Sequence, residues 1–172
     1  MTLEFLDLDE PPPEEGQRLD LRVANPSYEV EMADYRAALE RNPFAENDVC
    51  ETSAPRLVDP PDALMAPDEL CIPHRAVTFV VGYPFAGQYA VTVVASTPAG
   101  FTRAELFRQL VRVYSAMYAD AALSSVPHLH NMRVESSRFG TAWHRLDDLI
   151  VEEILLQTRA DGTVFAWVSL GS

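Results

Sequence analysis

The stretch GFTRAELFRQLVRVYSAMYAD, residues 100–120, has the start signals and the periodicity of an amphipathic helix. Thr102 and Glu105 predict a capping box, in which each side chain accepts a hydrogen bond from an otherwise unpaired backbone N–H. Apolar side chains at helical spacing predict one buried stripe, made of Leu106, Leu110, Val113, Tyr114 and Met117. A helix with one apolar face has to pack on another element, so the flanking segments decide the fold.

Two predicted hairpins flank this helix. Residues 76–84 and 88–96 alternate apolar and other side chains, as half-buried strands do. Residues 149–159 and 164–170 form the second pair, because Asp161-Gly162 between them suits a tight turn. In the last strand the alternation places four side chains on one face and two aromatic rings on the other: Val164, Ala166, Val168 and Leu170 opposite Phe165 and Trp167.

The order strand-strand-helix-strand-strand predicts an α+β domain of antiparallel hairpins with one main helix on a sheet. A β-grasp-like arrangement satisfies this order, although the pattern does not define which strands are neighbours. We assign this core domain to residues 76–172.

The front of the chain has a different character. Residues 1–24 are acidic and contain PPPEEG, which predicts an extended tail, or a strap over the domain in which LEFLDL docks through Leu3, Phe5 and Leu6. Residues 25–42 predict a helix that begins at Asn25-Pro26, and residues 43–75, with six prolines, predict a loop that wraps the domain or links that helix to it.

Composition excludes several kinds of chemistry. All 13 basic residues are arginine, so a P-loop lysine and a Schiff-base lysine are absent. The net charge is −13 and lies mostly in residues 1–75, which disfavours direct nucleic-acid binding and suits either a basic protein partner or a solvated surface. No stretch reaches the roughly 18 apolar residues of a membrane span, and the opening MTLEFLDLDE lacks the order of a secretory signal, which predicts an intracellular protein.

A zinc site is one candidate for chemistry. Nitrogen and sulfur ligands suit tetrahedral zinc, and the chain offers a C-x-x-H and an H-x-H pair: Cys71, His74, His128 and His130. The two pairs are more than fifty residues apart, so scattered histidines explain the pattern better and no cofactor is expected. Cys50 and Cys71 are expected to be reduced thiols in an intracellular protein.

The stretch FGTAWHRLDDLIVEE, residues 139–153, holds the other candidates. If residues 141–148 form a helical turn, His144 and Asp148 lie at i and i+4 and can form a general-base dyad. The alternative is that both side chains bond local backbone where a loop becomes a strand. Glu152 and Glu153 are a further candidate, as paired carboxylates. Adjacent strand residues point to opposite faces, so we expect one of them to be exposed and the other to lie at a strand edge or pair with arginine.

Residues 76–172 resemble a family of small uncharacterised proteins of large DNA viruses of algae and protists, with relatives in some eukaryotes. The resemblance lies in the capped helix, a glycine-aromatic-histidine segment, a D-L-apolar-apolar-E strand and a closing hairpin. The matching residues here are Phe139-Gly140, His144, Leu146, Asp148-Leu149, Glu152, Gly162 and Gly171-Ser172. The resemblance implies the fold and supplies no catalytic assignment.

These observations favour a non-enzymatic protein that acts through protein contacts, as a virion-associated or host-directed viral factor. The expected contact surface comprises residues 1–24, the loop 43–75 and exposed aromatic side chains of Phe85, Phe165 or Trp167. The alternatives are a small hydrolase or transferase that uses His144 with Asp148, and a zinc-stabilised binding module.

Overall fold

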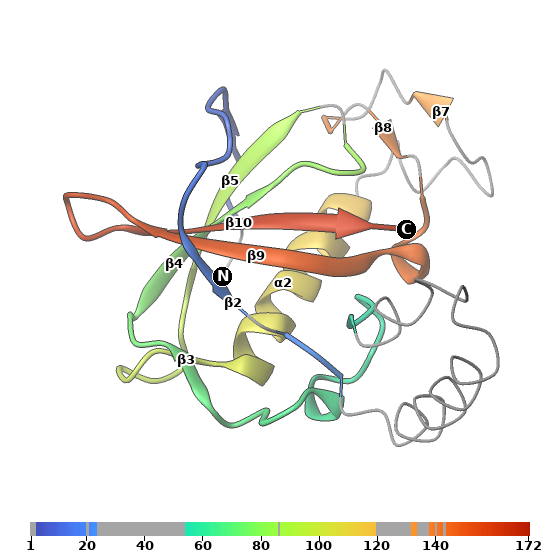
Figure 1. Ribbon diagram of the computed structural model, residues 1–172. Helices are drawn as coiled ribbons and strands as arrows, with labels where there is room; N and C mark the ends of the chain where they lie inside the picture. Colours follow the sequence, from blue (N-terminus) through green and yellow to red (C-terminus); the bar gives the residue numbers. More distant parts are fainter. Residues whose placement is uncertain are drawn as a thin grey trace, which may run out of the picture.

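The structure is a computed structural model that describes residues 3–19, 21–23, 54–85, 87–119, 132–133, 138–139, 141–142 and 144–172. Its main layer is a six-stranded sheet in the order β1-β5-β4-β10-β9-β2, and one long helix covers one face (Figure 1). The central elements are β4 (Ala76–Val81), β5 (Gln88–Val94), α2 (Arg103–Tyr118), β9 (Ile150–Thr158) and β10 (Val164–Gly171). The predicted α+β class and the strand-strand-helix-strand-strand order are therefore confirmed.

The two inner strands of the sheet, β4 and β10, run parallel to each other, whereas the β4–β5 and β9–β10 hairpins are antiparallel. The antiparallel pairing predicted within each hairpin is confirmed, and the parallel contact joins the two hairpins, whose order the pattern did not define. Five of the six residues of β4 and five of the eight residues of β10 are buried, as in strands covered on two faces. Placing the two most apolar strands side by side in the centre gives the β-grasp-like order.

The helix begins as its sequence predicts. The Thr102 hydroxyl accepts a hydrogen bond from the backbone N–H of Glu105 (3.2 Å), and the predicted apolar stripe is fully buried. The carboxylate of Glu105 differs from the expected capping box, because it accepts a hydrogen bond from the backbone N–H of Ser96 (2.5 Å). This bond ties the start of α2 to the loop that follows β5.

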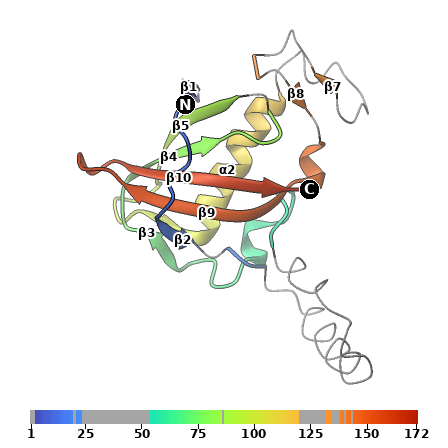
Figure 2. The same ribbon diagram turned by 45° about the horizontal axis from the view of Figure 1, so that its top comes forward.

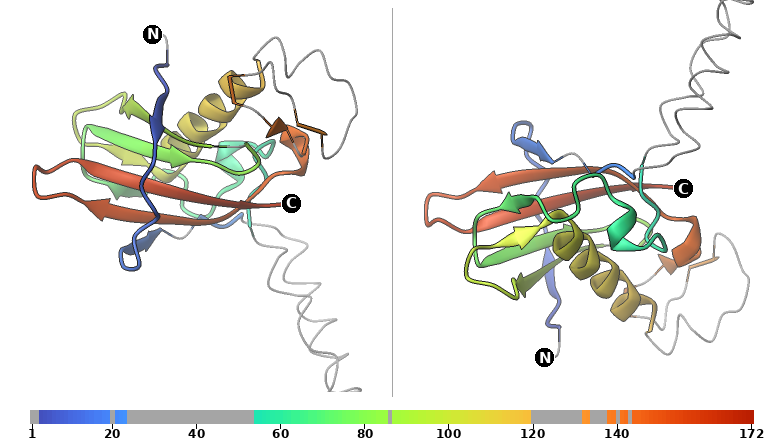
Figure 3. Two further views of the ribbon diagram at one scale, coloured as in Figure 1. Left: turned by 90° about the horizontal axis from the view of Figure 1, so that it is seen from above. Right: turned by 90° about the horizontal axis from the view of Figure 1, so that it is seen from below.

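The N-terminal region contributes two short strands to the sheet. β1 (Leu6–Leu8) pairs with β5 at one edge, and β2 (Gln17–Leu19) pairs with β9 at the other. Residues 9–16, which we call the strap, connect these two strands and cross the sheet on the face opposite α2 (Figure 3). Of the predicted docking residues, Phe5 is buried in the main core, but Leu6 is 59% exposed.

Residues 54–72, which we call the wrapping segment, surround one end of α2. Backbone hydrogen bonds join Leu57 to Leu149 and Val151 to Pro55, and a 3-10 helix (Pro61–Ala63) lies against α2. The segment ends in β3 (Leu70–Ile72), which pairs with β6 (Phe101–Thr102). The described part of the predicted loop therefore does wrap the domain.

Three smaller points complete the fold. The helix expected over residues 25–42 lies outside the described residues. Between α2 and η3 (Leu146–Asp148), two short strands, β7 (Met132–Arg133) and β8 (Thr141–Ala142), pair with each other. No helix in the described part of the chain is long and apolar enough to cross a membrane.

The aromatic side chains expected at the surface are buried. Phe85 packs between Tyr114, Tyr118 and Phe139. Phe165 and Trp167 form a second apolar cluster with Val80 on the outer face of the sheet. The predicted division of β10 into two faces is right. The expectation that these aromatic side chains are exposed was wrong, because all three are buried, Phe85 on the helix side of the sheet and Phe165 and Trp167 on the opposite face.

Candidate functional site

His144 lies beside the last residues of the chain. Its ring Nε2 is 3.2 Å from the hydroxyl of Ser172, which in turn is 3.0 Å from the hydroxyl of Tyr83. The Tyr83 and His144 rings also lie side by side, with centroids 5.6 Å apart. These three polar side chains form a small, partly exposed cluster at the end of β10.

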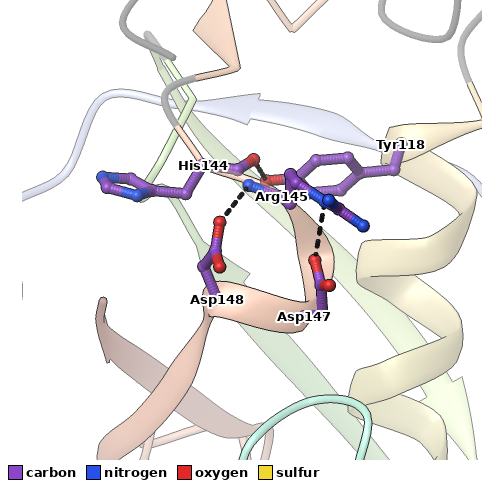
Figure 4. A network of polar contacts seen from close by, with 5 residues as sticks. All are labelled: Tyr118, His144, Arg145, Asp147 and Asp148. Carbon is purple, nitrogen blue, oxygen red and sulfur yellow. Dashed lines mark hydrogen bonds and ion pairs between the residues drawn. The ribbon is translucent and has the colours of Figure 1, made fainter. Parts of the chain in front are cut away.

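The backbone of His144 is fixed by α2. The hydroxyl of Tyr118 donates a hydrogen bond to the carbonyl oxygen of His144 (2.5 Å), as Figure 4 shows. Burial, followed by the nearby charge of Asp148, raises the pKa of Tyr118 above its ordinary value. The hydroxyl therefore remains protonated at neutral pH and remains a donor to this carbonyl.

Asp148 has a different partner from the His144 ring. Its carboxylate accepts a hydrogen bond from the backbone N–H of Arg145 (3.1 Å) and so caps the 3-10 helix η3 (Leu146–Asp148), while Arg145 pairs with Asp147 (3.0 Å). In Figure 4 the imidazole points away from the Asp148 carboxylate. Asp148 thus bonds local backbone, as the alternative interpretation expected. The two members of the predicted dyad have different partners, the Arg145 N–H for Asp148 and the Ser172 hydroxyl for His144.

The i, i+4 spacing does not bring the side chains of His144 and Asp148 together, because the helical turn begins after His144. Residues i and i+4 meet only when both lie in one helical turn. Here the turn begins at Leu146 with Arg145 as its N-cap, so His144 lies before the turn and is not on its surface. Ser172 and Tyr83, which do contact or neighbour the imidazole, are 28 and 61 residues away in sequence, and no motif links them to it.

The adjacent carboxylates have separate surroundings as well. Glu153 forms an ion pair with Arg18 of β2 (2.8 Å), which agrees with the expected arginine partner. Glu152 is exposed, and its carboxylate lies next to Gly171 on the neighbouring strand. The two groups do not converge on one substrate position.

The predicted zinc ligands are only partly described. The Cys71 thiol donates a hydrogen bond to the carbonyl oxygen of Phe101 (3.4 Å), and burial raises its pKa to about 11. His74 is exposed, while His128, His130 and Cys50 lie outside the described residues. Within the described ranges no three metal-ligating side chains gather.

A second candidate site is a surface. The wrapping segment carries three large, exposed apolar side chains within thirteen residues: Val58 (53%), Met65 (47%) and Leu70 (47%). Each has a buried apolar residue one or two positions away: Leu57, Leu64 and Ile72. The backbone that carries the exposed side chains is therefore fixed by the burial of these neighbours in the core.

The wrapping segment is also acidic. Four carboxylates belong to the same segment, namely those of Asp59, Asp62, Asp68 and Glu69, against one arginine, Arg56. Asp59 accepts a hydrogen bond from the backbone N–H of Arg56 (2.8 Å), and Glu69 pairs with Arg103 of α2 (3.2 Å). The arrangement can receive apolar side chains and nearby positive charges from another molecule.

Comparisons with protein-family models, with curated proteins and with solved structures find no match for this chain. The resemblance to the viral protein family therefore stays a prediction.

Proposed function

We propose that this chain is a non-enzymatic protein-interaction module that binds a partner through the wrapping segment. The observation that carries the proposal is the alternation of core anchors and exposed apolar side chains over residues 57–72. Single exposed apolar residues are common on protein surfaces, but three on one anchored segment form a preorganised surface. Binding to such a surface costs little ordering of the backbone, so the burial of apolar area contributes directly to affinity.

The four carboxylates of the wrapping segment favour a basic partner. Charged groups around an apolar centre speed association and exclude partners of the same sign. Residues 1–75 carry most of the net charge of −13, and the wrapping segment lies within that half. A partner with exposed apolar side chains flanked by arginine or lysine fits this surface best. If the viral resemblance holds, that partner is a virion component or a host protein.

The test is a triple substitution, Val58→Ser, Met65→Ser and Leu70→Ser. A stoichiometric partner is first isolated with the wild-type chain from its native source and purified. We expect the triple variant to bind it at least about tenfold more weakly, because central apolar contacts carry most of the energy of an interface. The dissociation constant is measured by calorimetry, and the melting temperature checks the fold.

The matched control is Leu6→Ser with Val94→Ser. These side chains have similar exposure (59% and 40%) but lie on β1 and β5, outside the wrapping segment. The proposal requires unchanged affinity in the control. Equal losses in both variants, or no loss in the triple variant, contradict the assigned surface, and a clean monomer that recovers no partner contradicts the proposed function.

One observation favours a second candidate, a small hydrolase. The Ser172 hydroxyl lies within hydrogen-bond distance of the His144 ring, which is how a nucleophile and its base are paired. The described residues supply no carboxylate to orient the other ring nitrogen, and Tyr83 shares the Ser172 hydroxyl.

Labelling with a fluorophosphonate probe separates the two candidate functions. Under the interaction proposal we expect no adduct on Ser172, because a serine with an unoriented base is scarcely more nucleophilic than a free hydroxyl. An adduct on Ser172 that His144→Ala abolishes, with the melting temperature preserved, would establish the hydrolase instead. Intact-protein mass spectrometry gives the readout.

A further inference from the structure

The outer face of the sheet carries an apolar cluster that the chain covers with its own strap. Val80, Phe165 and Trp167 are all more than nine-tenths buried there, and Leu8 and Leu155 pack beside them. In a two-layer domain the face opposite the helix is commonly solvated. Figures 2 and 3 show the blue N-terminal chain crossing this face between the β5 edge and the β9 edge.

The strap rests lightly on that face. Every residue from 9 to 16 is exposed except Pro13, which is half-buried. One ion pair holds its first half: Glu10 pairs with Arg159 (2.5 Å), and the Arg159 guanidinium lies 3.8 Å from the centroid of the Phe165 ring. Its last residue is seated closely, since a Cβ added at Gly16 would lie 2.7 Å from the backbone oxygen of Leu156.

The strap does not fill the space beneath it. A groove of about 420 Å³ lies along the sheet, with Pro12 and Pro13 among its lining residues and Tyr83, Leu155 and Trp167 among the others. The indole N–H of Trp167 is buried and has no hydrogen-bond acceptor among the described residues. A buried donor without an acceptor weakens the closed arrangement relative to one that supplies an acceptor.

We infer that this groove is a binding site for an extended, acidic, proline-rich segment of a partner protein, and that the strap is its intramolecular occupant. Proline-rich segments in the polyproline II conformation keep their carbonyl groups free and dock on aromatic grooves. Such a segment can supply an acceptor to Trp167 and an acidic side chain to Arg159, as the sequence DEPPPEEG of the strap supplies Glu10. This site lies on β4, β9 and β10, away from the wrapping segment, so it goes beyond the proposed function.

A labelled peptide with the sequence of residues 7–19, DLDEPPPEEGQRL, serves as the probe, and the full-length chain serves as the receptor. In the wild type the strap competes with the peptide and lowers its apparent affinity. Gly16→Ala places a methyl group against the backbone oxygen of Leu156 and the side chain of Leu155, and so loosens the last residue of the strap. We expect at least about tenfold tighter peptide binding to this variant by fluorescence polarisation. Glu10→Gln, which weakens the ion pair to Arg159, gives a smaller gain of the same sign.

Two controls show whether the groove is the site. Adding Trp167→Leu to Gly16→Ala removes an aromatic ring that lines the groove, and the affinity should fall again by about fivefold or more. A peptide with glycine at the three proline positions should bind at least about tenfold more weakly, since it loses the preformed polyproline conformation.

Three outcomes overturn the inference: no peptide binding to any variant, equal binding of the proline and glycine peptides, or a Gly16→Ala dimer that takes up no peptide. The dimer would show that the occupant in trans is the strap of a second copy. None of these outcomes bears on the wrapping segment, which is tested with variants outside the groove.

Discussion

Replacing Leu64 with alanine is expected to lower the free energy of unfolding by about 2–5 kcal/mol. Leu64 is almost completely buried in the main core, and its backbone pairs with Val23 as an isolated bridge. Truncating it leaves a cavity beneath the wrapping segment at the point where that segment meets the first part of the chain. Urea denaturation followed by circular dichroism measures the change as a lower midpoint with an unchanged slope.

The adjacent residue provides the control for this prediction. Met65 follows Leu64 directly in the sequence, but its side chain is 47% exposed. Met65→Ala should therefore change the free energy of unfolding by less than about 0.5 kcal/mol. Comparable losses in the two variants would mean that Leu64 does not anchor the segment. In that case the backbone under the exposed apolar side chains is not fixed by the core, and the surface is not preorganised for binding.

Gly100→Ala is expected to destabilise the protein by about 3 kcal/mol or more. Gly100 has φ +115°, where residues with a side chain are strained, and a Cβ there would lie 2.1 Å from the backbone oxygen of Ile72. Neither backbone can give way without moving β3 off β6, and Ile72 is one of the buried anchors of the wrapping segment. Thermal unfolding of the two proteins gives the comparison.

Gly162→Ala shows how much of the stability loss in Gly100→Ala comes from the positive φ alone, without a steric clash. Gly162 also has a positive φ, +84°, but a Cβ there meets no atom within 4 Å. Its substitution should therefore cost only about 1 kcal/mol. If both variants lose the same stability, the close approach of Gly100 to Ile72 contributes nothing.

The regular elements of the fold could be predicted because their patterns are long. Residues 103–118 repeat an apolar stripe over four turns, and each central strand is six or more residues long and rich in apolar side chains. Strand neighbours could not be predicted, since alternation identifies a buried face and says nothing about the adjacent strand. β1 and β2 have three residues each, which is too short for any periodicity to register.

The candidate sites were harder to predict for related reasons. The His144–Asp148 spacing assumed a turn that includes both residues, and the turn begins after His144. The anchors Leu57, Leu64 and Ile72 are seven and eight residues apart in a segment with little regular structure, so no period distinguishes them from their exposed neighbours. Phe165 and Trp167 lie on the outer face of the sheet, which a strap from the other end of the chain crosses, and no local pattern reveals that crossing.

Site-specific photo-crosslinking tests the assignment of the wrapping segment most directly. A photo-reactive amino acid is placed either at Met65 or, as the control, at Val94 of β5, and the purified complex with the partner is irradiated. The account predicts a covalent adduct with the partner from position 65 and none from position 94. An intact complex that crosslinks only from position 94 would contradict it.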